Sequence, residues 1–597
     1  MRLIWTLFIL QTLLLCASAY IGEYISLELM HIDIFEAINS FRVRRLHQVI
    51  NILFLVSSWL SQRRKMGNML HYFVSRQNIT TYLLWSAYLF LLVLYAEVIP
   101  NVYLYKYFIF PFIAAAIIFF PYLFEEDLIR NPTGLKETKY NFVLYGTRGQ
   151  VLPIPNPQSG IFIVGEPGCG KTKFLIEPLL AQMIHKGYAG VLYDYDFSPL
   201  PSKDYSLTHL AYRALQEFDQ KASIKRRFIS INFQDLTTSA RFNPIHSSYI
   251  EDRKKLSHSI NTFLLNLNPS LLAHDDFWNK NTYALLKGLI VMLSNKYPSY
   301  CTLPHAILLG LQPYQELISA LEADEEAAMY ASPILDAYKL APEQFAGVMA
   351  SFKITLERLL DKNLFWVLSG NDIPLTVNDP RRPLVVCLGN TPTEKSVISP
   401  VLSMCMAVLG GNMYAHNRLP SFNKADEIPT LVRPDLSEAP ATGRKYGIST
   451  VIALQNMAQL EKAYTAIGAK ELQDTFGNHF IGRGSLSSAQ YISDLVGKQE
   501  EESISTTESD KNVSRTTQQK ERVVITPQDA MTLKTGEFMG KIVHPKGGFF
   551  KMQLKPVVAY NKRLSYKYMS PLPVTYKQVD IEGNFKKIQE EVRRIVS

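Results

Sequence analysis

Cysteine is scarce in this chain, and the few present form no recognisable framework. Five occur among 597 residues: Cys16, Cys169, Cys301, Cys387 and Cys405. Their spacing matches neither a set of disulfides nor a zinc site, which fits a reducing compartment for the bulk of the chain. The twelve histidines are spread thinly, so no histidine-based metal centre or nuclease-like cluster is predicted.

Charge is also low, and no internal repeat is visible. Charged residues make up 19% of the chain and the net charge is +9. This weak basic bias permits nucleic-acid binding without showing it. Aromatic residues at 12% and hydrophobic residues at 47% exclude a disordered chain. The length suggests roughly three or four domains.

Apolar sequence is concentrated at the N-terminal end. Three uncharged stretches, Leu3–Gly22, Gln77–Ala96 and Tyr107–Phe124, have about the 18–20 residues needed to cross a hydrocarbon core. A fourth, Leu46–Ser61, is uncharged but short. It fits an interfacial or buried helix as well as a span. We therefore expect three or four membrane helices within residues 1–124.

A glycine-rich motif follows. The run "GEPGCGKT" matches G-x-x-x-x-G-K-[ST], between an apolar strand-like run, Gly160–Val164, and a segment of helical periodicity. In such a loop, backbone N–H groups face phosphates, Lys171 reaches the β- and γ-phosphates of ATP, and the Thr172 hydroxyl binds Mg²⁺. The predicted nucleotide contacts are Gly165, Glu166, Pro167, Gly168, Cys169, Gly170, Lys171 and Thr172.

An ATP site places everything after Phe124 in the cytoplasm, and basic residues then orient the spans. The cluster Arg63–Lys65 falls inside, as the positive-inside rule prefers. With three membrane spans the arginines within Arg42–Arg45 also lie on the cytoplasmic side, whereas with four spans they lie on the outer side. The positive-inside rule therefore favours three spans. Alternatively, Met1–Ala19, which ends in "ASA", is a cleaved signal peptide. In that case the ATP site would be in the cytoplasm only if Leu46–Ser61 also crosses the membrane, so that an odd number of spans remains.

Further strand-like runs alternate with helical segments. They are Gly190–Asp196, Arg227–Asn232, Pro383–Gly389 and Ile448–Leu454. Short buried strands alternating with helices predict a mostly parallel sheet with helices on both faces.

ATP hydrolysis also needs one carboxylate to help hold Mg²⁺ and another to polarise water. Asp426 and Glu427 in "FNKADEIPTL" are the candidates. The preceding run "LPSFNKA" is only partly apolar, and an isolated Asp-Glu doublet is usually solvated surface. Its distance after the glycine-rich loop, and the residues that follow, favour a functional pair.

Several blocks in order resemble the type IV secretion coupling proteins, the TraG/TraD-like conjugation ATPases, which are relatives of the FtsK/HerA ring motors. The blocks lie between Gly160 and Arg483. They are the glycine-rich loop, "VLYDYDFSPL", "INFQDLTTSARFNPI", "DDFWNKNTYALLKGLIVML", "ADEIPTL", "PATGRKYGISTVIALQNMAQLEKAY" and "FGNHFIGR". Membrane helices before the motor domain also resemble this family.

The resemblance implies roles for individual residues. Asp426 would belong to the second acidic motif and join Thr172 at Mg²⁺, and Glu427 would be the base that activates water. Arg444 in "TGRKYG" resembles an arginine finger that reaches the nucleotide of a neighbouring subunit. Gln455, which ends "VIALQ", resembles a polar sensor of the γ-phosphate.

The resemblance also implies a fold: an α/β, RecA-like P-loop ATPase domain with a mostly parallel sheet, an inserted all-alpha domain and N-terminal transmembrane helices. We expect the membrane region in 1–124 and the two parts of the nucleotide-binding domain in 125–250 and 376–497. The all-alpha insertion is expected in 251–375. The extension 498–597 should begin with a polar hairpin or exposed loop, then supply edge strands and a terminal helix.

The expected function is that of a multi-pass protein of the bacterial inner membrane with its ATPase domain in the cytoplasm. Six copies would form a ring that binds a relaxase–DNA complex and hands it to a type IV secretion channel through inner-membrane components. Single- or double-stranded DNA would be gripped through its phosphates. Two alternatives stay open: a nucleotide-gated docking receptor for protein cargo, and an FtsK-like DNA translocase, although no winged-helix reading domain is visible.

Overall fold

The computed structural model describes residues 138–201, 205–269, 277–509, 512–543 and 548–597. They belong to one structural unit, Glu137–Ser597. Within these ranges, no helix has both the length and the apolar character to cross a membrane. The membrane segments predicted for residues 1–124 lie outside the described residues.

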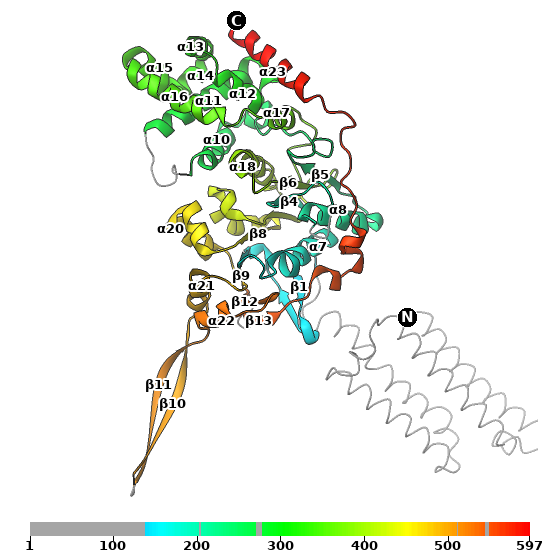
Figure 1. Cartoon of the computed structure of the whole chain (residues 1–597), viewed down its shortest axis with the longest axis vertical. Helices are drawn as coiled ribbons and strands as arrows, with labels where there is room; N and C mark the ends of the chain where they lie inside the picture. Colours follow the sequence, from blue (N-terminus) through cyan, green and yellow to red (C-terminus); the bar gives the residue numbers. More distant parts are fainter. Residues whose placement is uncertain (1–137, 202–204, 270–276, 510–511, 544–547) are drawn as a thin grey trace, which may run out of the picture. The chain divides into compact units, whose positions relative to one another are not determined.

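In the described part of the chain, nine strands form one central sheet (Figure 1). Their order is β13-β12-β9-β3-β8-β7-β4-β6-β5. From β9 to β5 all pairs are parallel, and β12 and β13 extend one edge in antiparallel fashion. The bounds are β3 (Ile161–Val164), β4 (Ala189–Asp194), β5 (Arg227–Ile231), β6 (Leu384–Gly389), β7 (Ser421–Ala425), β8 (Ile448–Leu454), β9 (Asn478–Ile481), β12 (Glu537–Lys541) and β13 (Phe549–Gln553).

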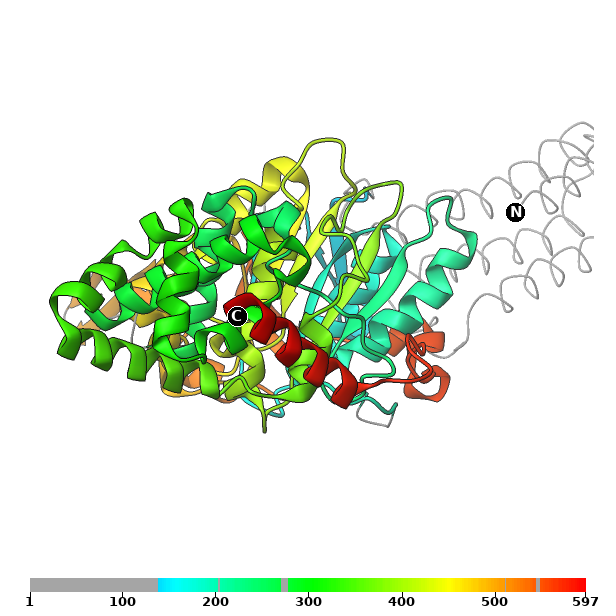
Figure 2. The same cartoon turned by 90° about the horizontal axis from the view of Figure 1, so that it is seen from above.

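Helices cover both faces of this sheet, which confirms the predicted α/β class (Figure 2). On one face lie α7 (Glu177–His185) and α8 (Leu207–Phe218), and on the other α18 (Lys395–Gly411), α20 (Met457–Thr475) and α21 (Leu486–Val496). Strand β8 serves both layers: Val451 and Ala453 face the first, and Ile452 and Leu454 face the second. Alternation of side chains along a doubly covered strand explains why the second half of β8, Val451–Leu454, is wholly apolar.

Shorter elements flank the sheet. They are the hairpin of β1 (Phe142–Tyr145) and β2 (Val151–Ile154), and the short helices α9 (Ser247–Ile250), α19 (Ala439–Gly443) and α22 (Pro527–Met531). The hairpin packs against α7, since the side chain of Gln182 bonds both backbone groups of Val143 at 2.8–2.9 Å.

Between β5 and β6 the chain leaves the sheet, and the regular elements among its described residues there are all helical, as predicted for this region (Figure 1). They are α10 (Arg253–Leu267), α11 (Phe277–Lys296), α12 (Leu303–Gly310), α13 (Tyr314–Glu322), α14 (Glu325–Tyr330), α15 (Ser332–Leu340), α16 (Pro342–Glu357) and α17 (Lys362–Leu368).

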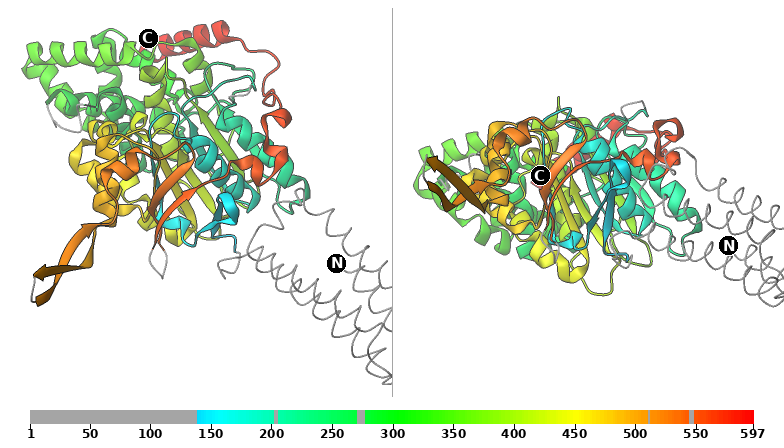
Figure 3. Two further views of the ribbon diagram at one scale, coloured as in Figure 1. Left: turned by 60° about the horizontal axis from the view of Figure 1, so that its bottom comes forward. Right: turned by 90° about the horizontal axis from the view of Figure 1, so that it is seen from below.

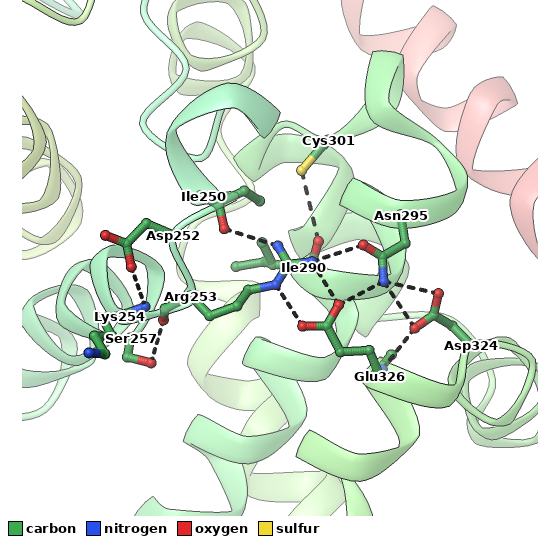
Figure 4. Close-up of polar contacts among 11 residues, drawn as sticks. Ile250, Asp252, Arg253, Lys254, Ser257, Ile290, Asn295, Cys301, Asp324 and Glu326 are labelled. Carbon is green, nitrogen blue, oxygen red and sulfur yellow. Dashed lines mark hydrogen bonds and ion pairs between the residues drawn. The ribbon is translucent and has the colours of Figure 1, made fainter.

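A polar cluster ties three of these helices together (Figure 4). Arg253, at the start of α10, donates two hydrogen bonds of 2.8 Å to the carboxylate of Glu326 in α14. Asn295 of α11 accepts from Arg253 at 2.8 Å and donates to Glu326 at 3.0 Å and to Asp324 at 3.2 Å. The Arg253 bonds hold the pKa of Glu326 at about 2, so this carboxylate stays charged over the ordinary pH range.

The C-terminal extension begins as a hairpin rather than a loop. Strands β10 (Lys498–Ser509) and β11 (Asn512–Val523) pair antiparallel along their whole length and project away from the sheet (Figure 3). The extension then adds the edge strands β12 and β13, as predicted, and ends in α23 (Ile581–Val596). That helix packs on the helical insertion, where Glu591 contacts His305 at 3.0 Å.

Candidate nucleotide site

The glycine-rich loop joins β3, in the middle of the sheet, to the helical turn that begins at Thr172. Its base is held by β8 and by the segment that follows β9. The N–H of Gly165 donates to the carbonyl of Leu454 at 3.2 Å, and that of Glu166 donates to the carbonyl of Arg483 at 2.8 Å. The loop therefore lies at the carboxyl edge of the parallel strands, where open α/β sheets bind ligands.

The glycines of this loop are required by its backbone. Gly168 and Gly170 have φ of +79° and +93°, values that side chains strongly disfavour. At Gly165, an added Cβ would lie 2.6 Å from the sulfur of Cys169, which is fully buried. Burial raises the pKa of the Cys169 thiol, so this residue fills space under the loop, and its side chain is not available to a ligand.

The lysine and threonine that end the loop differ in exposure. Lys171 is 8% exposed and its Nζ donates to the carbonyl of Gly165 at 2.5 Å, whereas Thr172 is exposed. The turn Thr172–Ile176 is π-helical, a form common at functional sites. Pro178 lies in the first turn of the following helix, α7, where a missing N–H is tolerated.

The acidic pair, Asp426 and Glu427, directly follows β7, the strand that lies between β4 and β8 in the sheet. The N–H of Asp426 donates to the carbonyl of Tyr193 at 3.3 Å. Burial raises the pKa of Asp426 to about 6 and that of Glu427 to about 7, while the Lys171 ammonium acts in the opposite direction on both. Gln455, directly after β8, lies beside Glu427 and also lowers its pKa. Lys171, Asp426, Glu427 and Gln455 thus converge at one edge of the sheet.

The structure explains why polar residues precede Asp426. Lys424 is fully buried in β7, and its Nζ donates to the carbonyl of Ile176 at 2.7 Å, where the π-helical turn ends. Burial lowers the pKa of Lys424 to about 7. Its bond joins the strand of the acidic pair to the helix of the glycine-rich loop. This contact was not predicted from the sequence. The signal that could have indicated it is a lysine in an otherwise strand-like run, two residues before Asp426.

Comparison with known proteins identifies the family. Residues 219–547, more than half of the chain, match the family described as "Type IV secretory system Conjugative DNA transfer". The chain belongs to this family. The predicted resemblance to type IV coupling proteins is therefore confirmed.

Solved structures of the bacterial conjugative coupling protein TrwB share the fold of this family member. The unbound monoclinic form has a TM-score of 0.54 at 16% identity, covering 72% of this chain and 91% of that one. The complex with ADP and Mg²⁺ has a TM-score of 0.53 at 17% identity, covering 75% and 94%. No curated protein is similar enough to count as a match.

Arg444 stands apart from the other predicted site residues of this conjugative DNA transfer protein. It is exposed in the short turn Arg444–Tyr446 before β8, at the amino edge of the sheet. Because β8 has seven residues and strands rise about 3.3 Å per residue, Arg444 and the glycine-rich loop of the same chain lie on opposite edges. With His416 and Arg418 it lines a hollow of about 370 Å³.

Proposed function

We propose that this protein is a P-loop ATPase motor of conjugative DNA transfer. The observation that carries the proposal is the convergence of Lys171, Asp426, Glu427 and Gln455 beside a loop with a phosphate-binding backbone. TrwB, which shares the fold, is described in complex with ADP and Mg²⁺ and with the non-hydrolysable GTP analogue GDPNP. Those ligands support a nucleotide in the same place here.

In the proposed site, the loop backbone cradles the phosphates and Lys171 turns from the Gly165 carbonyl to the β- and γ-phosphates. The hydroxyl of Thr172, an exposed residue, and the carboxylate of Asp426, a half-buried one, are oxygen donors of the kind that Mg²⁺ prefers. When bound, Mg²⁺ neutralises charge that develops on the phosphates.

Glu427 is proposed to accept the proton of the attacking water. Its pKa of about 7 is near the operating pH, which is where a general base is most effective. The amide of Gln455 beside it would fix the orientation of the carboxylate and connect it to the γ-phosphate.

Arg444 is proposed to act on the nucleotide of a neighbouring copy. Its place on the far edge of its own sheet supports this, since Arg444 cannot reach the loop of its own chain, whereas a head-to-tail ring joins different surfaces of neighbouring subunits. An arginine finger stabilises charge in the transition state of phosphoryl transfer. We propose a homo-hexamer from the resemblance to ring motors, and a ring would give an arginine that acts between subunits its partner site.

The apolar segments within residues 1–124 are proposed to anchor this ring in the bacterial inner membrane, with the motor in the cytoplasm. The substrate would be DNA carried by a relaxase, delivered to the secretion channel and its inner-membrane components.

The test is ATP hydrolysis by the full-length protein with and without single-stranded DNA. We expect stimulation by DNA, and loss of turnover in Lys171→Ala and in Arg444→Ala. Lys470→Ala is a matched control, because this lysine is 68% exposed and paired only along its own helix with Asp474. ATP binding without DNA-dependent turnover would refute the motor and favour a docking receptor.

A further inference from the structure

The outer side of the glycine-rich loop is held by a distant part of the chain, the turn between α22 and β12. The hydroxyl of Thr535 donates to the carbonyl of Gly168 at 3.1 Å, and the N–H of Gly536 donates to the carbonyl of Cys169 at 2.8 Å. Two consecutive carbonyls of the loop are therefore bonded on one side by the C-terminal extension.

These bonds set the direction of the loop N–H groups. In a planar trans peptide, the C=O and the N–H point in opposite directions. The carbonyl of Cys169 shares its peptide with the N–H of Gly170, so bonding that carbonyl to Gly536 turns the N–H of Gly170 the other way. The N–H of Cys169 donates to the carbonyl of Glu166 at 3.1 Å within the loop, so the N–H of Gly170 is the group that these contacts turn toward an anion.

The turn itself is anchored and shaped for this contact. Gly536 has φ of +81°, and an added Cβ would lie 2.7 Å from Nε2 of Gln553 and 3.1 Å from the ring of Phe174. The side chain of Gln553 donates to the carbonyl of Thr535 at 3.0 Å, and the N–H of Leu554 donates to the carbonyl of Gly536 at 2.8 Å. Strand β13 thus fixes the turn from behind, while Phe174 packs it against the helix of the loop.

We propose that Thr535 and Gly536 are positioning residues of the nucleotide site: they hold two consecutive loop carbonyls outward, which fixes the loop and preorganises the N–H of Gly170 for a phosphate. The inference rests on the proposed nucleotide site. It adds the C-terminal extension to that site, although its residues lie 367 positions beyond the loop. Preorganised donors improve binding because less order must be imposed when the ligand arrives.

Thr535→Val in the full-length protein removes the hydroxyl donor and keeps the shape of the side chain. We expect Mg²⁺–ATP to bind about two- to tenfold more weakly, the range for one lost hydrogen bond, with kcat at saturating ATP unchanged. Thr535→Ser should restore affinity. Thr532→Val is the matched control, since this exposed threonine donates only within its own helical turn, to Gln528 and Asp529.

A second pair of variants separates loop positioning from backbone strain. Gly187 has φ of +82° with nothing within 4 Å of an added Cβ, so Gly187→Ala matches the backbone strain of Gly536→Ala without its close contacts to Gln553 and Phe174. We expect both to lower thermal stability, and only Gly536→Ala to weaken Mg²⁺–ATP binding.

Unchanged affinity in Thr535→Val and Gly536→Ala, beside a wild-type protein that binds Mg²⁺–ATP, would overturn this inference and leave the proposed function standing. A wild-type protein that does not bind Mg²⁺–ATP would overturn both.

Discussion

The placement of Arg444 leads to a quantitative prediction about mixed rings. The glycine-rich loop follows β3, at one edge of the sheet, and Arg444 precedes β8, which is parallel to β3, at the other. The seven residues of β8 span about 23 Å, more than an arginine side chain can bridge. A site with both groups therefore needs two subunits, with Lys171 from one and Arg444 from the next.

Co-expression of Lys171→Ala and Arg444→Ala subunits then repairs a fraction of the sites. With equal random mixing, half of the subunits keep Lys171 and half of their neighbours keep Arg444. About a quarter of the interfaces are then complete, and the mixture should show about a quarter of wild-type turnover if sites act independently. Arg444→Ala alone should lower turnover about a thousandfold or more, the loss typical of a missing arginine finger, and Lys171→Ala alone should abolish turnover through loss of its phosphate contact.

The assay is ATP turnover of doubly tagged rings, so that only mixed rings are measured. The matched control is a mixture of wild-type subunits with subunits that carry both substitutions. If the two groups act across an interface, both mixtures reach about a quarter of wild type. If they act within one chain, the first mixture stays inactive and the second reaches about half. That second pattern would refute the geometric reasoning.

Three further predictions concern single residues. Glu427→Gln should keep Mg²⁺–ATP binding and lose about 10²–10⁴-fold in turnover; normal turnover would exclude Glu427 as the base. Burial lowers the pKa of His479 to about 4 in the folded protein. Between about pH 6.5 and pH 4, its imidazole is therefore protonated in the unfolded state and neutral in the folded state. The free energy of unfolding should therefore fall by up to about 3 kcal/mol as the pH drops from about 6.5 to about 4. Denaturant titrations at both pH values should show a smaller fall in His479→Gln, and an unchanged fall would contradict the assignment. Arg253→Met should lower the free energy of opening α10 by about 1 kcal/mol, because Glu326 is 39% exposed and water screens the ion pair. Amide hydrogen exchange in α10 measures this change. A loss of several kcal/mol would contradict the expectation of a weak, screened pair.

The sequence predicted the elements whose patterns are local. The buried strands β3, β4, β5, β6 and β8 were visible as short apolar runs, and the insertion was visible as helical periodicity. Strand β7 was hidden, because three of its five residues, Ser421, Asn423 and Lys424, are polar. It is buried nevertheless, and two of these polar groups have partners outside the strand: Asn378 lies 2.9 Å from the Ser421 hydroxyl, and Lys424 donates to the carbonyl of Ile176 at 2.7 Å.

By itself, the sequence determined the chemistry of the candidate site: a loop able to turn its N–H groups to phosphates, a lysine, an acidic pair and a family to which they belong. Only the tertiary structure decided which residues share an edge of the sheet. It placed Gln455 beside Glu427, Arg444 on the opposite edge, and Thr535 against Gly168. Strand order and register arise from contacts between segments far apart in the chain, and no local pattern carries that information.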